Sequence, residues 1–247
     1  MKRALPRTNF NSSKLIRFLS ELSIVDAPES KQTFSERLGD WLDFSDAITL
    51  HAAHSAISSP TAHAGRQSLA RVPVEEKFAR ARSAMINSIV TSCSPERGAA
   101  RLKLPTPEAG TGLESAAAYE QFRRFYVAHQ GEMELRVRPL RAQVRQALTS
   151  ASARLAQLAI LDAALESILG ARERQVLATV PALLEKRFAQ LLAAHQEQRA
   201  ASGDTDNPGP WLARFCGELQ GLLLAELDLR LQPTTGLIEA FSHETHQ

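Results

Sequence analysis

The chain has 247 residues, of which 44% are apolar and 23% are charged, and this is the composition of a globular protein rather than a disordered one. A chain of this length forms one large domain or two small ones. Its 29 basic and 27 acidic residues leave a formal net charge of +2, so no overall field draws the protein to nucleic acid or to an anionic membrane. Binding partners must therefore be sought in local features.

Cysteine usage and hydropathy indicate a cytoplasmic protein. Cys93 and Cys216 lie far apart among apolar residues, which suits buried thiols in a reducing compartment better than a disulfide. Residues 1–22 begin with basic side chains but lack the long apolar run and the cleavage site of a secretory leader. No apolar stretch reaches the ~18 residues that a spanning helix requires, so we expect no membrane insertion.

Helical periodicity dominates the N-terminal helical region, residues 1–93. A first helix is predicted after the capping residues 11–13, a second over 33–57, and a third from Pro73 onward. On the second helix, the apolar residues that are in register are Phe34, Leu38, Trp41, Ile48 and Ala52.

Residues 94–113 are rich in proline, glycine and polar residues, and they are predicted to form a flexible linker to a long-hairpin bundle over 114–232. From residue 114 onward, apolar residues recur every three or four positions, and Gly170 is expected to end this helix and turn the chain. A second helix then runs to about Ala201. The pattern predicts an antiparallel, coiled-coil-like helical hairpin.

Prolines are expected to interrupt the helices of the hairpin and to end the C-terminal helix. Pro139 is expected to kink the first long helix, because the apolar stripe keeps its phase across it, and Pro181 is expected to break the second. A last helix over 210–231 has leucines around most of its circumference and should be the most buried element. We expect Pro233 to end this helix and 233–247 to form a loose tail. The predicted fold class is all-α, a helical bundle with a long hairpin and a buried leucine-rich C-terminal helix.

Four arginines line one edge of the apolar stripe in the segment 134–148 and are candidates for an interaction surface. They are Arg136, Arg138, Arg141 and Arg145. In one interpretation, their stems cover apolar surface and their charged heads stay in water. In the other, they form a basic face for an acidic partner or for the phosphates of nucleic acid. The lack of exposed aromatic residues beside them weighs against nucleic acid.

Two other charge patterns bear on assembly. Asp162 interrupts the apolar stripe and is a candidate for fixing helix register or oligomeric state; alternatively, it turns to the edge of the bundle. Residues 203–247 carry an acidic excess that complements the basic excess of residues 123–154. We expect these two regions to pair, either within one molecule or between subunits.

Nothing in the sequence matches a catalytic or cofactor-binding motif. The spacing of His51 and His54 suits a shared metal ion, but no third ligand accompanies them at helical spacing, so solvated imidazoles are the better interpretation. Cys216 lies on the most apolar helix, where its thiol should stay neutral and unreactive. We therefore expect no enzyme activity, no cofactor, no metal and no small-molecule substrate.

Two segments carry a resemblance that covers most of the chain, namely YEQFRRFYVAHQGEMELRVRPLRAQVRQAL and LLLAELDLRLQPTTGLIEAF. Through them, the chain resembles a family of uncharacterised, all-helical proteobacterial proteins known only as a domain of unknown function. The resemblance implies no site residues. It does imply a cytoplasmic accessory to an envelope assembly, because members are often encoded near proteins that look like proton-channel stators and peptidoglycan-binding domains.

These observations lead to two expectations about function. The first is a non-enzymatic helical interaction or accessory protein, with a protein partner or a second copy of itself as ligand. The alternative is a nucleic-acid-associated regulatory protein that uses the arginine edge of the long helix.

Overall fold

The structure is a computed structural model that describes residues 13–22, 34–58, 71–94, 102–105, 116–202 and 209–245. These residues form eight α-helices and no strand, which confirms the predicted all-α bundle. The helices are α1 (Lys14–Glu21), α2 (Phe34–Trp41), α3 (Phe44–Ser58), α4 (Arg71–Cys93), α5 (Ala116–Ala151), α6 (Ala153–Leu177), α7 (Val180–Ser202) and α8 (Gly209–Thr245). No helix within the described ranges is long and apolar enough to cross a membrane.

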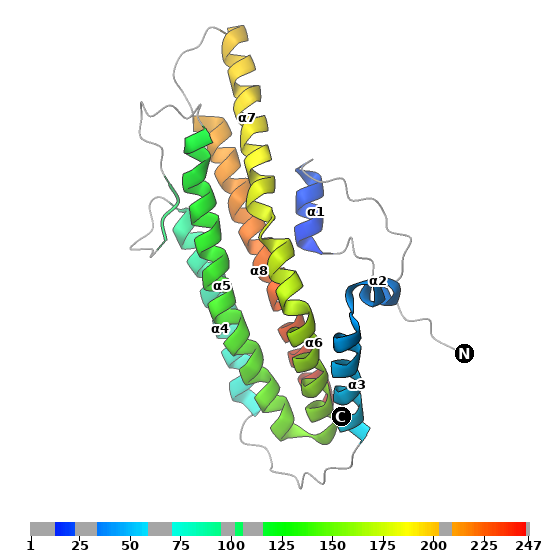
Figure 1. The fold of residues 1–247 in the computed structure, drawn as a ribbon. Coiled ribbons are helices and arrows are strands. Elements are labelled where there is room, and N and C mark those ends of the chain that lie inside the picture. The colour runs from blue at the N-terminus through cyan, green and yellow to red at the C-terminus, as the bar shows by residue number, and fades with distance from the viewer. Residues whose placement is uncertain are drawn as a thin grey trace, which may run out of the picture.

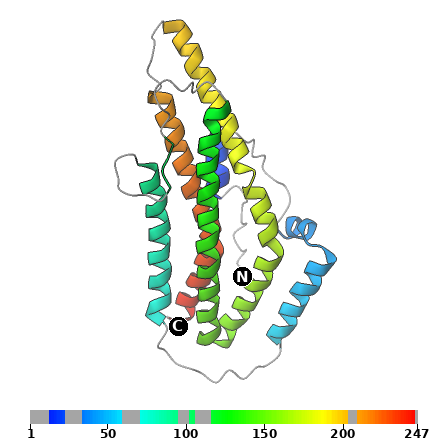
Figure 2. The same ribbon diagram turned by 60° about the vertical axis from the view of Figure 1, so that its left-hand side comes forward.

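The long helices lie alongside one another as rods of alternating direction (Figures 1 and 2). Helix α5 runs antiparallel to α4, α6 and α7 return along α5, and α8 reverses direction once more. The short helix α1 packs on α8, and α3 packs on α6 at the outside of the bundle. Helix α8 contacts α1, α4, α5, α6 and α7, so the predicted central position of the leucine-rich helix is confirmed.

The hairpin turn lies at Ser152, between α5 and α6, and the predicted turn at Gly170 is wrong. Ser152 adopts extended backbone geometry (φ −154°, ψ 161°), and its Oγ accepts a hydrogen bond from the Leu155 backbone N–H at 3.1 Å. This N-cap satisfies a donor that the first turn of α6 would otherwise leave unpaired. Gly170 lies inside α6, because tertiary packing outweighs the ~1 kcal/mol by which glycine disfavours a helix.

The two prolines of the hairpin behave differently. The chain breaks at residues 178 and 179, just before Pro181, as predicted. Helix α5 continues through Pro139. Pro139 and Leu135 are exposed, so the Leu135 carbonyl that loses its intrahelical donor lies on the solvent side of the helix.

Helix α8 also continues through its proline, so the predicted end at Pro233 and the loose tail over 233–245 are wrong. Pro233 is exposed, whereas Leu237 and Phe241 of the same helix are buried. They form a second apolar cluster with residues of α4, α5 and α6, namely Val74, Val144, Leu148, Leu155 and Ala159. This burial offsets the ~3 kcal/mol that a proline costs inside a helix. Residues 246–247 lie outside the described part of the chain.

One core joins the predicted N-terminal region to the hairpin bundle. Leu15 of α1 and Phe78 of α4 belong to the same buried cluster as Phe122 of α5 and Leu223 of α8. The predicted division into two regions therefore does not separate two cores within the described residues.

Only part of the predicted linker, residues 94–113, is described. Leu102 and Leu104 pack against the main core, and the Leu104 backbone N–H donates to the Ser92 carbonyl at 2.9 Å. These contacts place this piece of the linker on the bundle surface. Residues 95–101 and 106–113 lie outside the described ranges.

The helix predicted over 33–57 is divided at residues 42–43 into α2 and α3. Asp43 and Asp46 cap the start of α3 reciprocally: Asp43 Oδ1 accepts from the Asp46 N–H at 2.8 Å, and Asp46 Oδ2 accepts from the Asp43 N–H at 3.1 Å. The break changes the helical phase, so Ala53 is buried while Trp41, Ile48 and Ala52 are exposed. These last three residues belong to the predicted apolar register, but the structure leaves them exposed.

Candidate interaction surface and buried charge networks

Two of the four candidate arginines lie in the interface between α5 and α6. Arg141 binds Asp162 with two nitrogens, Nε at 2.8 Å and Nη2 at 2.6 Å, and Arg145 Nη1 adds a bond to the same carboxylate at 2.9 Å. The three side chains are only 11%, 17% and 10% exposed for Arg141, Arg145 and Asp162. A bidentate contact of this kind fixes the geometry of both partners, so the cluster joins the two arms of the hairpin.

Arg145 has a second acidic partner in α6, because its Nη1 lies 2.6 Å from Glu166. Burial disfavours the charged guanidinium, but the hydrogen bonds to Asp162 and Glu166 outweigh burial and raise the pKa of Arg145. Asp162 is therefore turned toward α5 of its own chain and not to the bundle edge.

The other two candidate arginines remain on the surface. Arg136 pairs with Glu132 of its own helix at 3.8 Å, and Arg138 is exposed. The four arginines therefore do not form one continuous basic face, because Arg141 and Arg145 turn inward.

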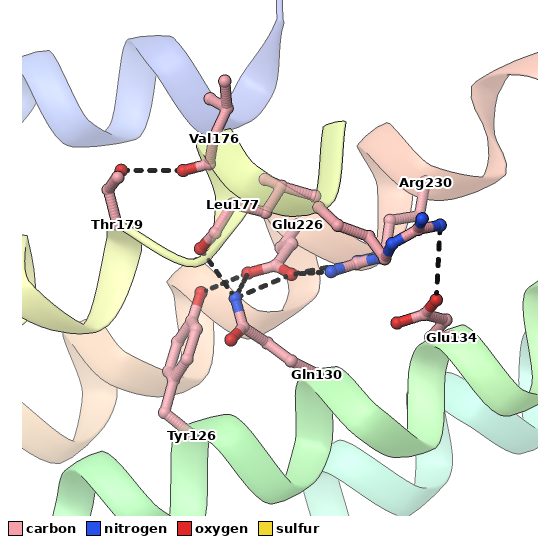
Figure 3. A network of polar contacts seen from close by, with 9 residues as sticks. Tyr126, Gln130, Glu134, Val176, Leu177, Thr179, Glu226 and Arg230 are labelled. Carbon is pink, nitrogen blue, oxygen red and sulfur yellow. Dashed lines mark hydrogen bonds and ion pairs between the residues drawn. The ribbon is translucent and has the colours of Figure 1, made fainter. Parts of the chain in front are cut away.

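A second polar network surrounds Glu226, which is 0% exposed in the middle of the leucine-rich helix α8 (Figure 3). Tyr126 Oη donates to Glu226 Oε2 at 2.8 Å, and Gln130 Nε2 lies 3.0 and 3.1 Å from the two carboxylate oxygens. Arg230, one turn along α8, provides the countercharge with Nη2 at 2.8 Å. Each carboxylate oxygen thus has donors, which is the condition for keeping a charge in an apolar interior.

The Glu226 network also reaches the break between α6 and α7. Gln130 Nε2 donates to the carbonyl oxygen of Leu177, the last residue of α6, at 2.9 Å (Figure 3). This bond satisfies a carbonyl that the helix end leaves without an intrahelical partner. Burial, and after it the charge of Glu226, raises the pKa of Tyr126 well above its ordinary value, so its hydroxyl stays a donor.

Within the described residues, the acidic C-terminal region does not form the predicted ion pairs with the basic residues 123–154 of the same molecule. Glu226 binds Arg230, and Glu218 binds Arg187 of α7 and Arg214 of α8. The acidic partners of the α5 arginines come instead from α5 itself and from α6. Sequence reasoning missed Glu226, although one signal was present: it is a carboxylate on a helix that is apolar around most of its circumference.

A buried histidine joins α4 to α5. Ser92 Oγ lies 2.9 Å from His129 Nε2, within hydrogen-bond distance, and donates to the Ile89 carbonyl at 2.8 Å. Burial lowers the pKa of His129 and keeps the imidazole neutral.

The two thiols are free and half-buried, and burial raises the pKa of both Cys93 and Cys216 to about 11. A thiol with so high a pKa is protonated at neutral pH and is a poor nucleophile. The two candidate metal ligands, His51 and His54, are exposed on α3. Among the described residues, no three acidic, histidine or cysteine side chains are grouped to hold a metal ion.

An open groove of about 470 Å³ lies between α1, α4 and α8. Its polar side chains largely satisfy one another, because Lys14 and Arg82 both bind Asp228, at 3.1 and 3.6 Å. At its floor, Phe18 packs so closely on Gly221 that a Cβ there would lie 2.7 Å from the ring. The glycine therefore allows α1 to dock on α8.

Apolar side chains are exposed together on α2 and α3. Phe44 is 83% exposed, Ile48 55% and Trp41 40%. Trp41 is partly covered by the guanidinium of Arg172 in α6, 5.1 Å from the ring centroid. We call Trp41, Phe44 and Ile48 the α3 surface; it is the candidate interaction surface of the described residues.

The positions of residues around helix α3 explain why Phe44 and Ile48 of the α3 surface are exposed. The side chains that face α6 recur at Asp46, Leu50 and Ala53, all of them half-buried or buried. Phe44 and Ile48 lie on the opposite side of the helix at 100° per residue. Among the described residues, α6 packs on one face of α3, and the opposite face is exposed.

The fold and its polar networks define the class of this protein: an all-helical bundle whose buried charges pair with one another. The chain belongs to the family described as "Protein of unknown function (DUF3348)", whose model matches residues 1–243. No curated protein and no solved structure matches the chain.

Proposed function

We propose that this chain is a non-enzymatic helical interaction or accessory protein that binds a protein partner through the α3 surface. The supporting observation is that Phe44 and Ile48 are exposed side by side, one helical turn apart. Large apolar residues rarely gather on the surface of a soluble protein without a partner, and aromatic side chains dominate the energetics of protein interfaces. The buried charge clusters give the long helices a fixed geometry on which such a surface can be held.

The setting that fits this role is a cytoplasmic accessory to an envelope assembly. The two free thiols suit a reducing compartment, and the family resemblance suggests the assembly. Nucleic-acid binding has less support, because Arg141 and Arg145 are engaged with α6 and only Arg136 and Arg138 remain on the surface.

Site-specific photo-crosslinking tests the proposal. A photoreactive residue at Ile48, introduced in cells that produce the chain, should give a discrete covalent adduct with a protein, and Phe44→Glu should abolish this adduct. The matched control is a photoreactive residue at Leu135, which is 78% exposed on α5 and lies outside the α3 surface. Equal adducts from both positions, or none from Ile48, would refute the proposal.

A further inference from the structure

The α3 surface carries a pattern that identifies one occupant. Phe44, Ile48, His51 and Ser55 are all exposed and are spaced four, three and four positions apart, so they form one stripe along the helix. Ala52 flanks the stripe and is exposed as well. Phe44 and Ile48 thus occupy the N-terminal half of the stripe, whereas its C-terminal end has the small side chains of Ala52 and Ser55 beside His51.

The polar side chains of α3 are also distributed unevenly along the helix. Asp43 and Asp46 stand at its N-terminal end, whereas His51 and His54 stand in its C-terminal half. An antiparallel second copy would place large side chains against small ones and carboxylates beside imidazoles. A parallel copy would place carboxylate beside carboxylate. Helix dipoles favour the antiparallel arrangement too, because opposite ends then lie together.

We propose that the occupant of the α3 surface is the α3 surface of a second copy of this chain, packed antiparallel about a twofold axis near Ile48. This inference rests on the proposed function and names the partner of that same surface. A twofold interface requires a surface that complements itself, so that each residue meets its counterpart twice. The pattern of α3 meets this requirement: Phe44 lies opposite Ala52 and Ser55 of the second copy, and Asp43 lies beside His54 of the second copy.

The size of the surface sets the expected strength. A helix of 15 residues is about 22 Å long, and the stripe covers less than the ~800 Å² per partner of a standard interface. The dimer is therefore expected to be weak and to dissociate on dilution. Sedimentation of the full chain should show its mass rising from monomer to dimer with concentration.

Two surface variants test whether α3 holds the dimer. Ile48→Glu should raise the dissociation constant by about tenfold or more, because it places two like charges at the twofold axis. Leu135→Glu is the matched control and should dimerise like the wild type, since it introduces the same charge at an exposed apolar position on α5. Equal weakening by both variants, or a wild type that stays monomeric at several hundred micromolar, would overturn the proposal.

Cysteine crosslinking tests the orientation. Ile48→Cys should form a disulfide with its own copy under mild oxidation, because the two positions meet at the axis. Phe44→Cys should not, because its two copies lie about 12 Å apart along the helix axis, beyond the reach of a disulfide. A mixture of Phe44→Cys and Ala52→Cys chains should instead crosslink to each other. Wild-type chain gives the background from the native thiols.

The outcomes separate this inference from the proposed function. Self-crosslinking of Phe44→Cys would indicate a parallel pair and overturn the antiparallel assignment. If the chain stays monomeric while the photoreactive residue at Ile48 still captures a different protein, the second copy is excluded and the proposed function stands. If no covalent product forms at Ile48 in either experiment, both proposals fall.

Discussion

The Glu226 network and the α3 surface reverse the usual placement of side chains in opposite ways. Glu226 is a charged residue with 0% exposure inside the bundle, whereas Phe44 is an aromatic residue with 83% exposure outside it. The interior charge has donors from Tyr126, Gln130 and Arg230, so it is satisfied within the chain. The exterior ring is exposed among the described residues, and we propose that another molecule covers it. The comparison teaches that an unusual residue is structural where its partners come from its own chain, and a candidate for binding where they do not.

The comparison is tested most strongly by removing the countercharge of Glu226. Arg230→Met should lower the free energy of unfolding by about 3–5 kcal/mol, because it leaves a buried carboxylate without its cation. Urea denaturation measures this loss. The double variant Glu226→Leu with Arg230→Met should recover much of it, since both charges are then absent. A loss below about 1 kcal/mol for the single variant would show that the network carries little stability.

Asp162→Leu tests the second buried cluster. It should lower the free energy of unfolding by about 2–4 kcal/mol, because Arg141 and Arg145 then remain in the α5–α6 interface without the carboxylate that binds both. We expect no change in oligomeric mass, since Asp162 faces its own chain. The matched control is Arg138→Leu, an exposed position where the change should stay within about 0.5 kcal/mol.

The buried imidazole of His129 predicts the direction of a pH dependence. Because burial lowers its pKa, the unfolded chain binds a proton more readily than the folded chain. The neutral imidazole therefore favours folding fully above the ordinary histidine pKa of about 6.5, and this contribution is lost as the pH falls. Thermal unfolding between pH 7.5 and 5.5 should show a smaller decline for His129→Asn than for the wild type. Identical declines would contradict the assignment.

The smallest effect on stability is expected at the α3 surface. Phe44→Glu and Ile48→Glu should each change the free energy of unfolding by no more than about 0.5 kcal/mol, because neither side chain is part of the core. Urea denaturation at a concentration where the chain is monomeric provides the test. A loss as large as that of Asp162→Leu would mean that these side chains stabilise the monomer and are not reserved for a partner.

The all-α class and most of the buried stripe could be predicted from the sequence, because helical periodicity reports which face of a helix is apolar. The break before Pro181 could be predicted as well, but the position of the hairpin turn could not. Glycine commonly follows the end of a helix, but Gly170 lies inside α6. Ser152 is the N-cap of α6, but no glycine or proline beside it marks the turn in the sequence. Local propensities of about 1 kcal/mol are easily outweighed by packing over a long helix.

Because the turn was predicted at the wrong residue, the contact between the arginines of α5 and Asp162 could not be predicted either. Arg141 and Asp162 lie at almost equal distances on either side of Ser152, so a turn there brings them opposite each other, but a turn at Gly170 does not. The α3 surface was hidden for a similar reason. In the predicted continuous helix over 33–57, Trp41 and Ile48 were in register with each other. In the structure the helix breaks at the capping residue Asp43, so the two residues lie on separate helices and no longer share one helical register.

Side-chain footprinting of Phe44 and Ile48 examines the α3 surface whichever protein covers it. Radical labelling of dilute purified chain should modify both residues readily, as their exposure requires, and labelling in concentrated lysate of the producing cells should modify them several times less. Leu135 should be labelled equally in both samples. Equal labelling of Phe44 and Ile48 in the two samples would contradict the role of α3 as an interaction surface.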